Sequence, residues 1–292
     1  MLRLGVDVGG TKIAVGLFSD EGLIISKKYM VTEVVSFPEF LCDVCSAVCE
    51  EAGISISEVE GLGIGIPGSV SEDGRRVLKA PNIKILSPDL VERTEALTGL
   101  KVRMVQDSRA AAYGEYLFGG GKGASLVVCV TVGTGIGTGI VVDGKMYNGG
   151  IGYAGETGHV PVSQSNRTCG CGKRGCLETL SAGKGLDMTA RELLGEGNDA
   201  RQLFDAASSG NAAALEAIII ARTELARMLT AIVNVLSPDV LLISGGMSLQ
   251  RELYIDPIME FVREHSYSAE RSTRVEIASL GELSGLYGAA FV

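Results

Sequence analysis

The chain has 292 residues, of which 46% are hydrophobic and 21% charged. This composition is typical of a globular protein and not of a disordered one, and the length suits one large domain or two lobes with a sizeable core. The formal net charge of −9 argues against nucleic acid as a routine partner, because phosphate neutralisation requires clustered Lys and Arg.

The N-terminus and the cysteines together indicate a cytoplasmic protein. The opening residues MLRLGVDVGG read as a strand, with no basic segment before an apolar one, so no secretory signal is expected. No apolar run reaches the ~18 residues that a membrane span needs, so no membrane partner is expected. Seven cysteines is an odd number, which without a secretory signal predicts free or metal-bound thiols in a reducing compartment.

Two β-rich segments share one layout and predict an internal repeat. Residues 2–18 read LRLGVDVGGTKIAVGLF, and residues 126–144 read LVVCVTVGTGIGTGIVVDG. Each has a β-run, a glycine turn and a second β-run, and 124 residues separate Val6 from Val130. A repeated unit at the head of each half predicts two related lobes with a ligand between them.

Helices and strands alternate along the rest of the chain. A first helix is expected over residues 37–52, where Cys45 and Cys49 lie on the apolar stripe and Cys42 at its edge, which favours core packing over metal binding. Strands are expected at 60–66, 102–105, 240–243 and 275–278, and helices at 88–97, 108–117, 211–236, 248–265 and 284–292. This alternation, with hairpins, predicts the α/β class.

The first glycine turn can wrap phosphate oxygens. Gly9 and Gly10 offer backbone N–H groups without side chains, Thr11 adds a hydroxyl group and Lys12 a positive charge. Asp7, at the end of the first strand, is placed to hold Mg²⁺ through water. The alternative is a plain hairpin turn. The sequence has no G-x-x-x-x-G-K-[ST] motif, so any phosphate is bound without a P-loop.

Two further glycine turns also follow apolar strands. Thr134 and Gly135 can grip the same phosphate chain, and Gly245 and Gly246 let a flat adenosine lie against the backbone. The 40 glycines concentrate in such short loops beside apolar runs, which predicts backbone that approaches ligands. Together the three turns favour ATP as a ligand.

Asp107 follows a predicted strand and opens a predicted helix. One interpretation is a helix N-cap, a position that Asp fills well. The other is a general base that accepts the proton of a hydroxyl group attacking the γ-phosphate. Phosphoryl transfer needs alignment, charge stabilisation and one such base.

A cluster of soft ligands predicts a metal site. His159, Cys169, Cys171 and Cys176 supply one nitrogen and three sulfurs, which is the set of a closed structural Zn²⁺ site. Buried free thiols are the alternative, but the segment has few apolar residues to bury them. A catalytic zinc is disfavoured because the protein fills all four positions. The ligands lie in residues 153–180, YAGETGHVPVSQSNRTCGCGKRGCLETL. Two carboxylates adjoin them: Glu156 is three residues before His159, and Glu178 is two residues after Cys176.

Four blocks of this sequence resemble the ROK family of bacterial sugar kinases and repressors. They are Asp7-x-Gly9-Gly10-Thr11-Lys12, the run Gly133-Thr134-Gly135-x-Gly137, GETGH at 155–159, and Cys169-x-Cys171-Gly-x-x-Gly-Cys176-x-Glu178. The resemblance covers nearly the whole chain, from Leu4 to Ala290.

The resemblance implies an actin-like, ribonuclease-H-type fold of two α/β lobes with mixed sheets, binding Mg-ATP and sugar in the cleft between them. The expected lobes are residues 1–110 and 111–280, the second carrying the zinc segment 153–180, with a closing helix at about 281–292 that returns to the first. The implied reaction transfers the γ-phosphoryl group of ATP to a hexose hydroxyl, usually the 6-OH. A homo-oligomer, dimer or tetramer, is also implied.

Residue by residue, the resemblance implies that Asp107 is the catalytic base. It also implies that the cluster of His159 and three cysteines binds zinc. It implies sugar contacts by Asn82, Glu156, His159 and Glu178, so that one imidazole nitrogen of His159 serves the metal and the other the sugar. Family members commonly carry Asn-Asp where this chain has Gln106-Asp107, and the longer Gln106 side chain re-aims one sugar contact.

Glucose is the expected substrate, with N-acetylmannosamine, N-acetylglucosamine, allose and fructose as rivals. A sugar sensor without turnover and an actin-like ATPase without a sugar pocket are the other hypotheses. The chain starts at the phosphate turn with no helix-turn-helix extension before it, which disfavours the repressor branch.

Overall fold

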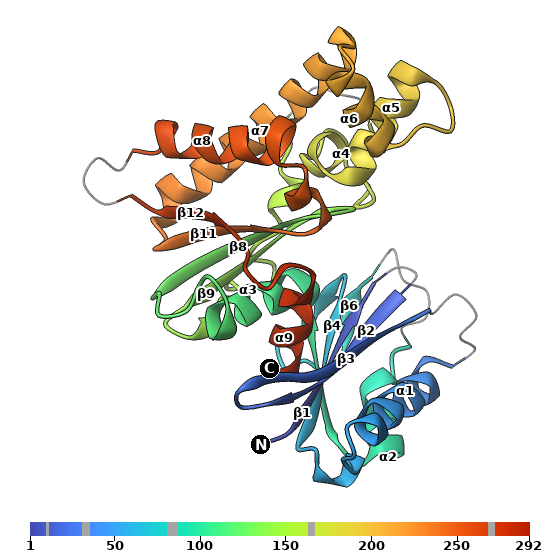
Figure 1. Ribbon diagram of the computed structural model, residues 1–292. Helices are drawn as coiled ribbons and strands as arrows, with labels where there is room; N and C mark the ends of the chain where they lie inside the picture. The colour runs from blue at the N-terminus through green and yellow to red at the C-terminus, as the bar shows by residue number, and fades with distance from the viewer. Residues whose placement is uncertain (10–11, 31–35, 81–86, 163–166, 268–271) are drawn as a thin grey trace. The chain divides into compact units, whose positions relative to one another are not determined.

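The computed structural model describes residues 1–9, 12–30, 36–80, 87–162, 167–267 and 272–292 (Figure 1). The pattern of contacts divides the chain into two compact units. Unit 1 comprises residues 1–123, 139–154 and 283–292, and unit 2 comprises residues 124–138 and 155–282. The chain therefore passes between the units more than once, and the last helix belongs to the same unit as the first strand.

The first sheet has the strand order β3-β2-β1-β4-β7. Its members are β1 (Arg3–Val8), β2 (Lys12–Ser19), β3 (Gly22–Met30), β4 (Gly61–Ile66) and β7 (Lys101–Gln106). The first three form an antiparallel meander, whereas β1, β4 and β7 are parallel to one another. The sheet is therefore mixed, as the family resemblance implied.

Helices cover both faces of the first sheet. On one face lie α1 (Phe37–Glu51) and α2 (Leu90–Thr98), and on the other lie α3 (Asp107–Phe118) and α9 (Ser284–Ala290), as Figure 1 shows. The buried thiols of Cys45 and Cys49 belong to the core under α1, which confirms their predicted packing role. Two short strands, β5 (Ser69–Val70) and β6 (Val77–Lys79), form a separate hairpin.

Glycines inside β1 and β4 let α9 approach the sheet. A Cβ atom at Gly5 would lie 2.6 Å from the carbonyl oxygen of Leu286, and one at Gly63 would overlap the carbonyl group of Ala289. The prediction that glycine marks backbone near ligands concerned short loops and does not cover these two strand positions. They serve close packing of a helix on a sheet, because any side chain there would push α9 away.

The second sheet has the order β10-β9-β8-β11-β12, which matches the order of the first strand for strand. Its members are β8 (Leu126–Val132), β9 (Ile136–Val142), β10 (Lys145–Met146), β11 (Val240–Ser244) and β12 (Arg274–Ile277). Strands β8, β11 and β12 are parallel, as β1, β4 and β7 are. This confirms the predicted repeat. The chain leaves unit 2 and enters unit 1 within β9.

The helices of unit 2 include one long apolar helix, α7 (Ala212–Leu236), in agreement with its prediction. Its N-cap Asn211 accepts the N–H of Ala214. The predicted helix at 248–265 is divided into a 3₁₀ turn, a π-helical turn and α8 (Asp256–His265). The sequence analysis did not identify α4 (Glu178–Ser181), α5 (Gly183–Leu194) or α6 (Ala200–Ser208). None of the helices in the described ranges has the length and hydropathy of a membrane span.

Candidate active site and metal centre

In unit 1 the carboxyl ends of three parallel strands meet at one edge of the first sheet. The register places Asp7 of β1 beside Gly65 of β4, and Gly65 beside Val105 of β7. Strand β7 ends at Gln106, and Asp107 follows directly. Asp7 and Asp107 therefore lie at the same edge, which is where α/β sheets bind their ligands.

Asp107 is the first residue of α3 and not the cap that precedes it. Gln106 occupies the N-cap position, without a side-chain cap bond. The Oδ1 atom of Asp107 accepts the N–H of the adjacent Ser108 at 2.6 Å. The N-cap interpretation of Asp107 is thus wrong. Its half-buried carboxylate at the strand edge is consistent with a role towards a ligand.

Asp7 has a carboxylate that is poorly solvated. Burial raises the pKa of Asp7 from 3.8 to about 6. Two glycines frame the group: a Cβ at Gly65 would lie 3.5 Å from Oδ1, and one at Gly285 would lie 3.0 Å from Oδ2. Because desolvation disfavours the charged form, a cation beside this carboxylate would be stabilising.

The described part of the first turn is closed by a backbone bond. The N–H of Gly9 donates to the carbonyl group of Lys12 at 2.9 Å, and the Lys12 side chain is exposed. Gly10 and Thr11 of this turn, and the predicted sugar contact Asn82, lie outside the described residues. Their roles stay predictions.

In unit 2 the other two glycine turns lie at one edge of the second sheet, because β8 and β11 are parallel neighbours. Gly245 has φ +89°, and a Cβ there would lie 2.5 Å from the carbonyl oxygen of Val132. At Gly246 a Cβ would meet no atom within 4 Å. Gly245 therefore serves a tight turn, and Gly246 presents open backbone as a flat ligand requires.

Glu178 lies against the second glycine turn. Its Oε2 atom accepts the N–H of Ile136 at 3.1 Å. A Cβ at Gly135 would overlap the same oxygen, so a larger residue there would displace this carboxylate from its present position. The sequence analysis assigned Glu178 to sugar and Thr134 with Gly135 to phosphate. The structure brings the carboxylate and the turn into contact.

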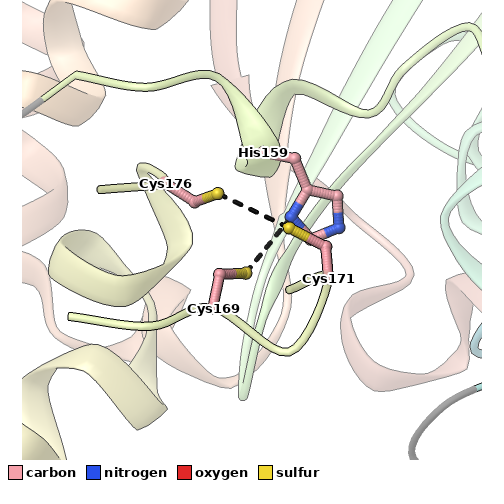
Figure 2. A group of neighbouring side chains, drawn as sticks. All are labelled: His159, Cys169, Cys171 and Cys176. Atoms are coloured by element: carbon pink, nitrogen blue, oxygen red, sulfur yellow. Dashed lines mark hydrogen bonds between the residues drawn. The ribbon is translucent and has the colours of Figure 1, made fainter. Parts of the chain in front are cut away.

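The four predicted zinc ligands converge in unit 2 (Figure 2). One ligand atom from each lies within 4.8 Å of all the others. Nδ1 of His159 is 3.5 Å from Sγ of Cys169, and Sγ of Cys171 is 3.7 Å from Sγ of Cys176. One nitrogen and three sulfurs at this spacing fit a tetrahedral zinc ion.

The thiols of this cluster influence one another. Burial raises the pKa of Cys169 to about 12. Burial opposes ionisation of Cys171 too, but the backbone N–H of Lys173 and the neighbouring thiols lower the pKa of Cys171 below its ordinary value. A thiol-rich cluster that favours one thiolate is suited to a cation, since a metal ion deprotonates the thiols that bind it.

His159 presents its two nitrogens to different partners. Nδ1 faces the thiols, while Nε2 lies 3.7 Å from Oε2 of Glu156. The segment 155–159 packs closely against β9. Cβ atoms at Gly155 and Gly158 would overlap the carbonyl groups of Thr138 and Ile136. The close contacts of Gly155 and Gly158 with β9 thus hold the backbone that positions the His159 ring.

One residue of the metal loop has a role that the sequence analysis missed. The guanidinium group of Arg167 donates to the carbonyl oxygens of Thr179 at 3.0 Å and Gly185 at 3.2 Å. It also forms a bidentate pair with Glu192. No sequence motif predicts these contacts, because the partners are two backbone carbonyl groups and the side chains of Thr189 and Glu192, all in α4 and α5, which were not predicted.

Comparison with known proteins identifies the family. The ROK family profile matches residues 3–292. The chain belongs to the ROK family. The glucokinase of Streptomyces coelicolor is 34% identical, with 99% of this chain and 96% of that protein aligned. The structure of a ROK family glucokinase from Streptomyces griseus in complex with glucose and AMPPNP has a TM-score of 0.80 and 32% identity, over 99% of this chain and 98% of that one.

A ROK hexokinase from Thermus thermophilus is also similar, with a TM-score of 0.83 and 30% identity, over 99% of this chain and 97% of the other. This ROK protein therefore has the actin-like ATPase fold with mixed sheets, and it is a sugar kinase of the hexose-phosphorylating class. Other relatives carry different names. They include an N-acetylmannosamine kinase of Salmonella paratyphi A at 30% identity and a xylose repressor of Caldicellulosiruptor bescii at 26%, of which the alignment covers 76%.

Proposed function

We propose that this protein transfers the γ-phosphoryl group of Mg-ATP to the 6-OH of glucose. The observation that carries the proposal is the position of Asp107 at the carboxyl end of β7, on the same strand edge as Asp7, with the N-cap position taken by Gln106. The similarity to a glucokinase crystallised with glucose and AMPPNP supports both ligands.

In this proposal Asp107 acts as the general base. Its carboxylate accepts the proton of the 6-OH as that oxygen attacks the γ-phosphorus, and the bond between the γ-phosphorus and the bridging oxygen breaks to release ADP. Asp7 holds Mg²⁺ through water, for which its poorly solvated carboxylate is suited.

Backbone N–H groups bind the nucleotide. Gly9, Gly10, Thr11 and Lys12 surround phosphate oxygens, and so do Thr134 and Gly135. The adenosine lies along Gly245 and Gly246, where the backbone of Gly246 is open. Fixed N–H dipoles of this kind stabilise charge without reorganising during the reaction.

Sugar hydroxyls bind Glu156, His159, Glu178, Asn82 and Gln106. Carboxylates that are held in place orient the acceptor and so reduce the entropy lost in reaching the transition state. Structural zinc on the His159 and cysteine cluster would hold the segments that carry Glu156 and Glu178. Zinc would supply no reacting group there, because its four ligands come from the protein.

A different hexose is the second candidate. Gln106 is buried at the end of β7, next to Asp107, and its side chain is one methylene longer than the Asn common in the family. A longer amide at a sugar contact changes which hydroxyl or N-acetyl group the site accepts. The N-acetylmannosamine kinase among the relatives makes 2-acetamido sugars part of the test.

The test is a kinase assay with Mg-ATP on a panel of aldohexoses, ketohexoses and N-acetylhexosamines. We expect turnover, with the highest kcat/KM for glucose and no ADP release without sugar. A highest kcat/KM for an N-acetylhexosamine would contradict glucose and leave the kinase class in place. Absence of sugar phosphate from every member of the panel, with folded and metal-loaded protein, would refute the proposal.

A further inference from the structure

Arg109 is a buried cation close to Asp107 in the chain, in unit 1. It is the third residue of α3, and 6% of its surface is exposed. A buried guanidinium is costly unless several acceptors surround it. The identity of its acceptors therefore indicates what the side chain does.

Two of the acceptors belong to a loop that is distant in sequence. Nη2 of Arg109 donates to the carbonyl oxygen of Gly152 at 2.6 Å and to that of Ala154 at 3.2 Å. Both carbonyl groups are in the loop Asn148–Ala154, which follows β10. The guanidinium thus attaches this loop to the helix that begins with Asp107.

The loop is closed on itself at its base. The N–H of Ala154 donates to the carbonyl oxygen of Asn148 at 3.1 Å. Gly149 and Gly152 have φ of +74° and +83°, which other residues rarely adopt. At the tip, Ile151 is 84% exposed, so apolar packing of the tip contributes little to holding the loop.

We propose that Arg109 is a positioning residue for the sugar-binding segment. Ala154 is two residues before Glu156, so fixing the carbonyl group of Ala154 fixes one end of the segment that carries Glu156. The single nitrogen Nη2 donates both bonds, and the planar guanidinium fixes the directions of its two N–H groups, whereas the N–H groups of a lysine ammonium rotate freely. This inference rests on the proposed sugar-binding role of Glu156.

The test compares Arg109→Met, Arg109→Lys and Arg109→Ala with a matched control, Arg222→Met. Arg222 also donates to a backbone carbonyl group, that of Leu253 at 2.7 Å, but it belongs to unit 2 and has no proposed role in the reaction. Hydrogen exchange of peptides covering residues 147–157 is measured first, since it does not depend on turnover. KM for sugar and for ATP are measured next.

We expect exchange within 147–157 to accelerate about 10- to 100-fold in Arg109→Met, because a charge-assisted hydrogen bond is worth roughly that factor. KM for sugar rises by a similar factor, while KM for ATP stays within about twofold. Arg109→Lys retains part of the effect, and millimolar guanidinium partly restores the sugar KM of Arg109→Ala. Arg222→Met changes neither the exchange of this loop nor the sugar KM.

Unchanged exchange in the loop would overturn the attachment. Faster exchange with an unchanged sugar KM, or a loss of thermal stability alone as in Arg222→Met, would reduce Arg109 to a structural role and overturn the positioning proposal. If the wild-type protein phosphorylates no sugar, the proposed function fails, and the positioning role fails with it. The exchange measurement then still decides whether Arg109 holds the loop.

Discussion

The two five-stranded sheets have the same strand order, but their carboxyl edges carry different chemistry. The edge of the first sheet presents two carboxylates, Asp7 and Asp107. The edge of the second presents the backbone of two glycine turns, one of which contacts Glu178. One scaffold used twice thus carries a glycine turn at both edges, and the first edge adds the carboxylates of Asp7 and Asp107.

The two copies also differ in how their strands pack. In unit 1, Gly5 of β1 and Gly63 of β4 admit α9 almost to the backbone. The corresponding strands of unit 2, β8 (LVVCVTV) and β11 (VLLIS), contain no glycine and bury branched side chains instead. In the first sheet this packing reaches the functional edge, because a Cβ at Gly285 of α9 would lie 3.0 Å from Oδ2 of Asp7.

The largest effect on the first edge is expected from Asp107→Asn. Loss of the general base lowers kcat by about 10²- to 10⁴-fold, while sugar binding measured by calorimetry persists. Asp89→Asn is the matched control, because Asp89 is exposed and precedes helix α2. Near-normal turnover of Asp107→Asn would contradict the role of the base.

The packing difference predicts a large effect on stability at Gly63. Gly63→Ala would place a methyl group on the carbonyl group of Ala289 and lower the free energy of unfolding by about 3 kcal/mol or more. In the same strand a Cβ at Gly61 would lie 3.3 Å from the carbonyl oxygen of Lys101, so Gly61→Ala should cost much less. Equal midpoints for the two variants in urea denaturation would show that α9 moves away without cost.

The raised pKa of Asp7 predicts a pH dependence of stability. Folding takes up a proton between the ordinary pKa of 3.8 and the folded value of about 6. The stability that protonated Asp7 contributes to the fold is fully present below about pH 3.8 and is lost as the pH rises through about 6. Without magnesium, Asp7→Asn should therefore be more stable than the wild type above pH 7, by up to about 3 kcal/mol.

The control for this measurement is Asp20→Asn. The hydrogen bond from the N-terminal ammonium lowers the pKa of Asp20. Removing the Asp20 carboxylate therefore lowers the free energy of unfolding above about pH 4. Urea denaturation at two pH values on either side of about 6 separates the two signs. A pH-independent difference between Asp7→Asn and the wild type would show that Asp7 is ionised at no cost in the fold.

The smallest effects are expected at the metal cluster of unit 2, which has no counterpart among the described residues of unit 1. Cys171→Ser should lower the zinc content, expected at one ion per chain, and raise the sugar KM by about tenfold. The ATP KM should rise less, although Glu178 also touches the second glycine turn. Cys42→Ser, in unit 1 and outside the cluster, serves as the control. Equal changes in both KM values would mean that zinc only stabilises unit 2.

Much of the fold was predictable because its signals are local. The strands, the repeated glycine turn and the helix α7 follow from apolar periodicity over a few residues. The cluster of four candidate metal ligands was also predictable, since His159 and the three cysteines lie within one short segment. Helices α5 and α6 were missed, although α6 has a capping box at Asp199 that could have identified it.

The chemical groups available to this protein can be identified from its amino-acid sequence: two carboxylates at strand ends, three glycine turns and a cluster of soft metal-ligand candidates. The tertiary structure decided which groups meet. Gly5 and Gly63 are explained by α9, which is far away in the chain, and Gly135 by the carboxylate of Glu178. Arg109 and Arg167 each donate to two backbone carbonyl groups. Every residue has such a group, so no pattern of residue types can reveal these contacts before the chain folds.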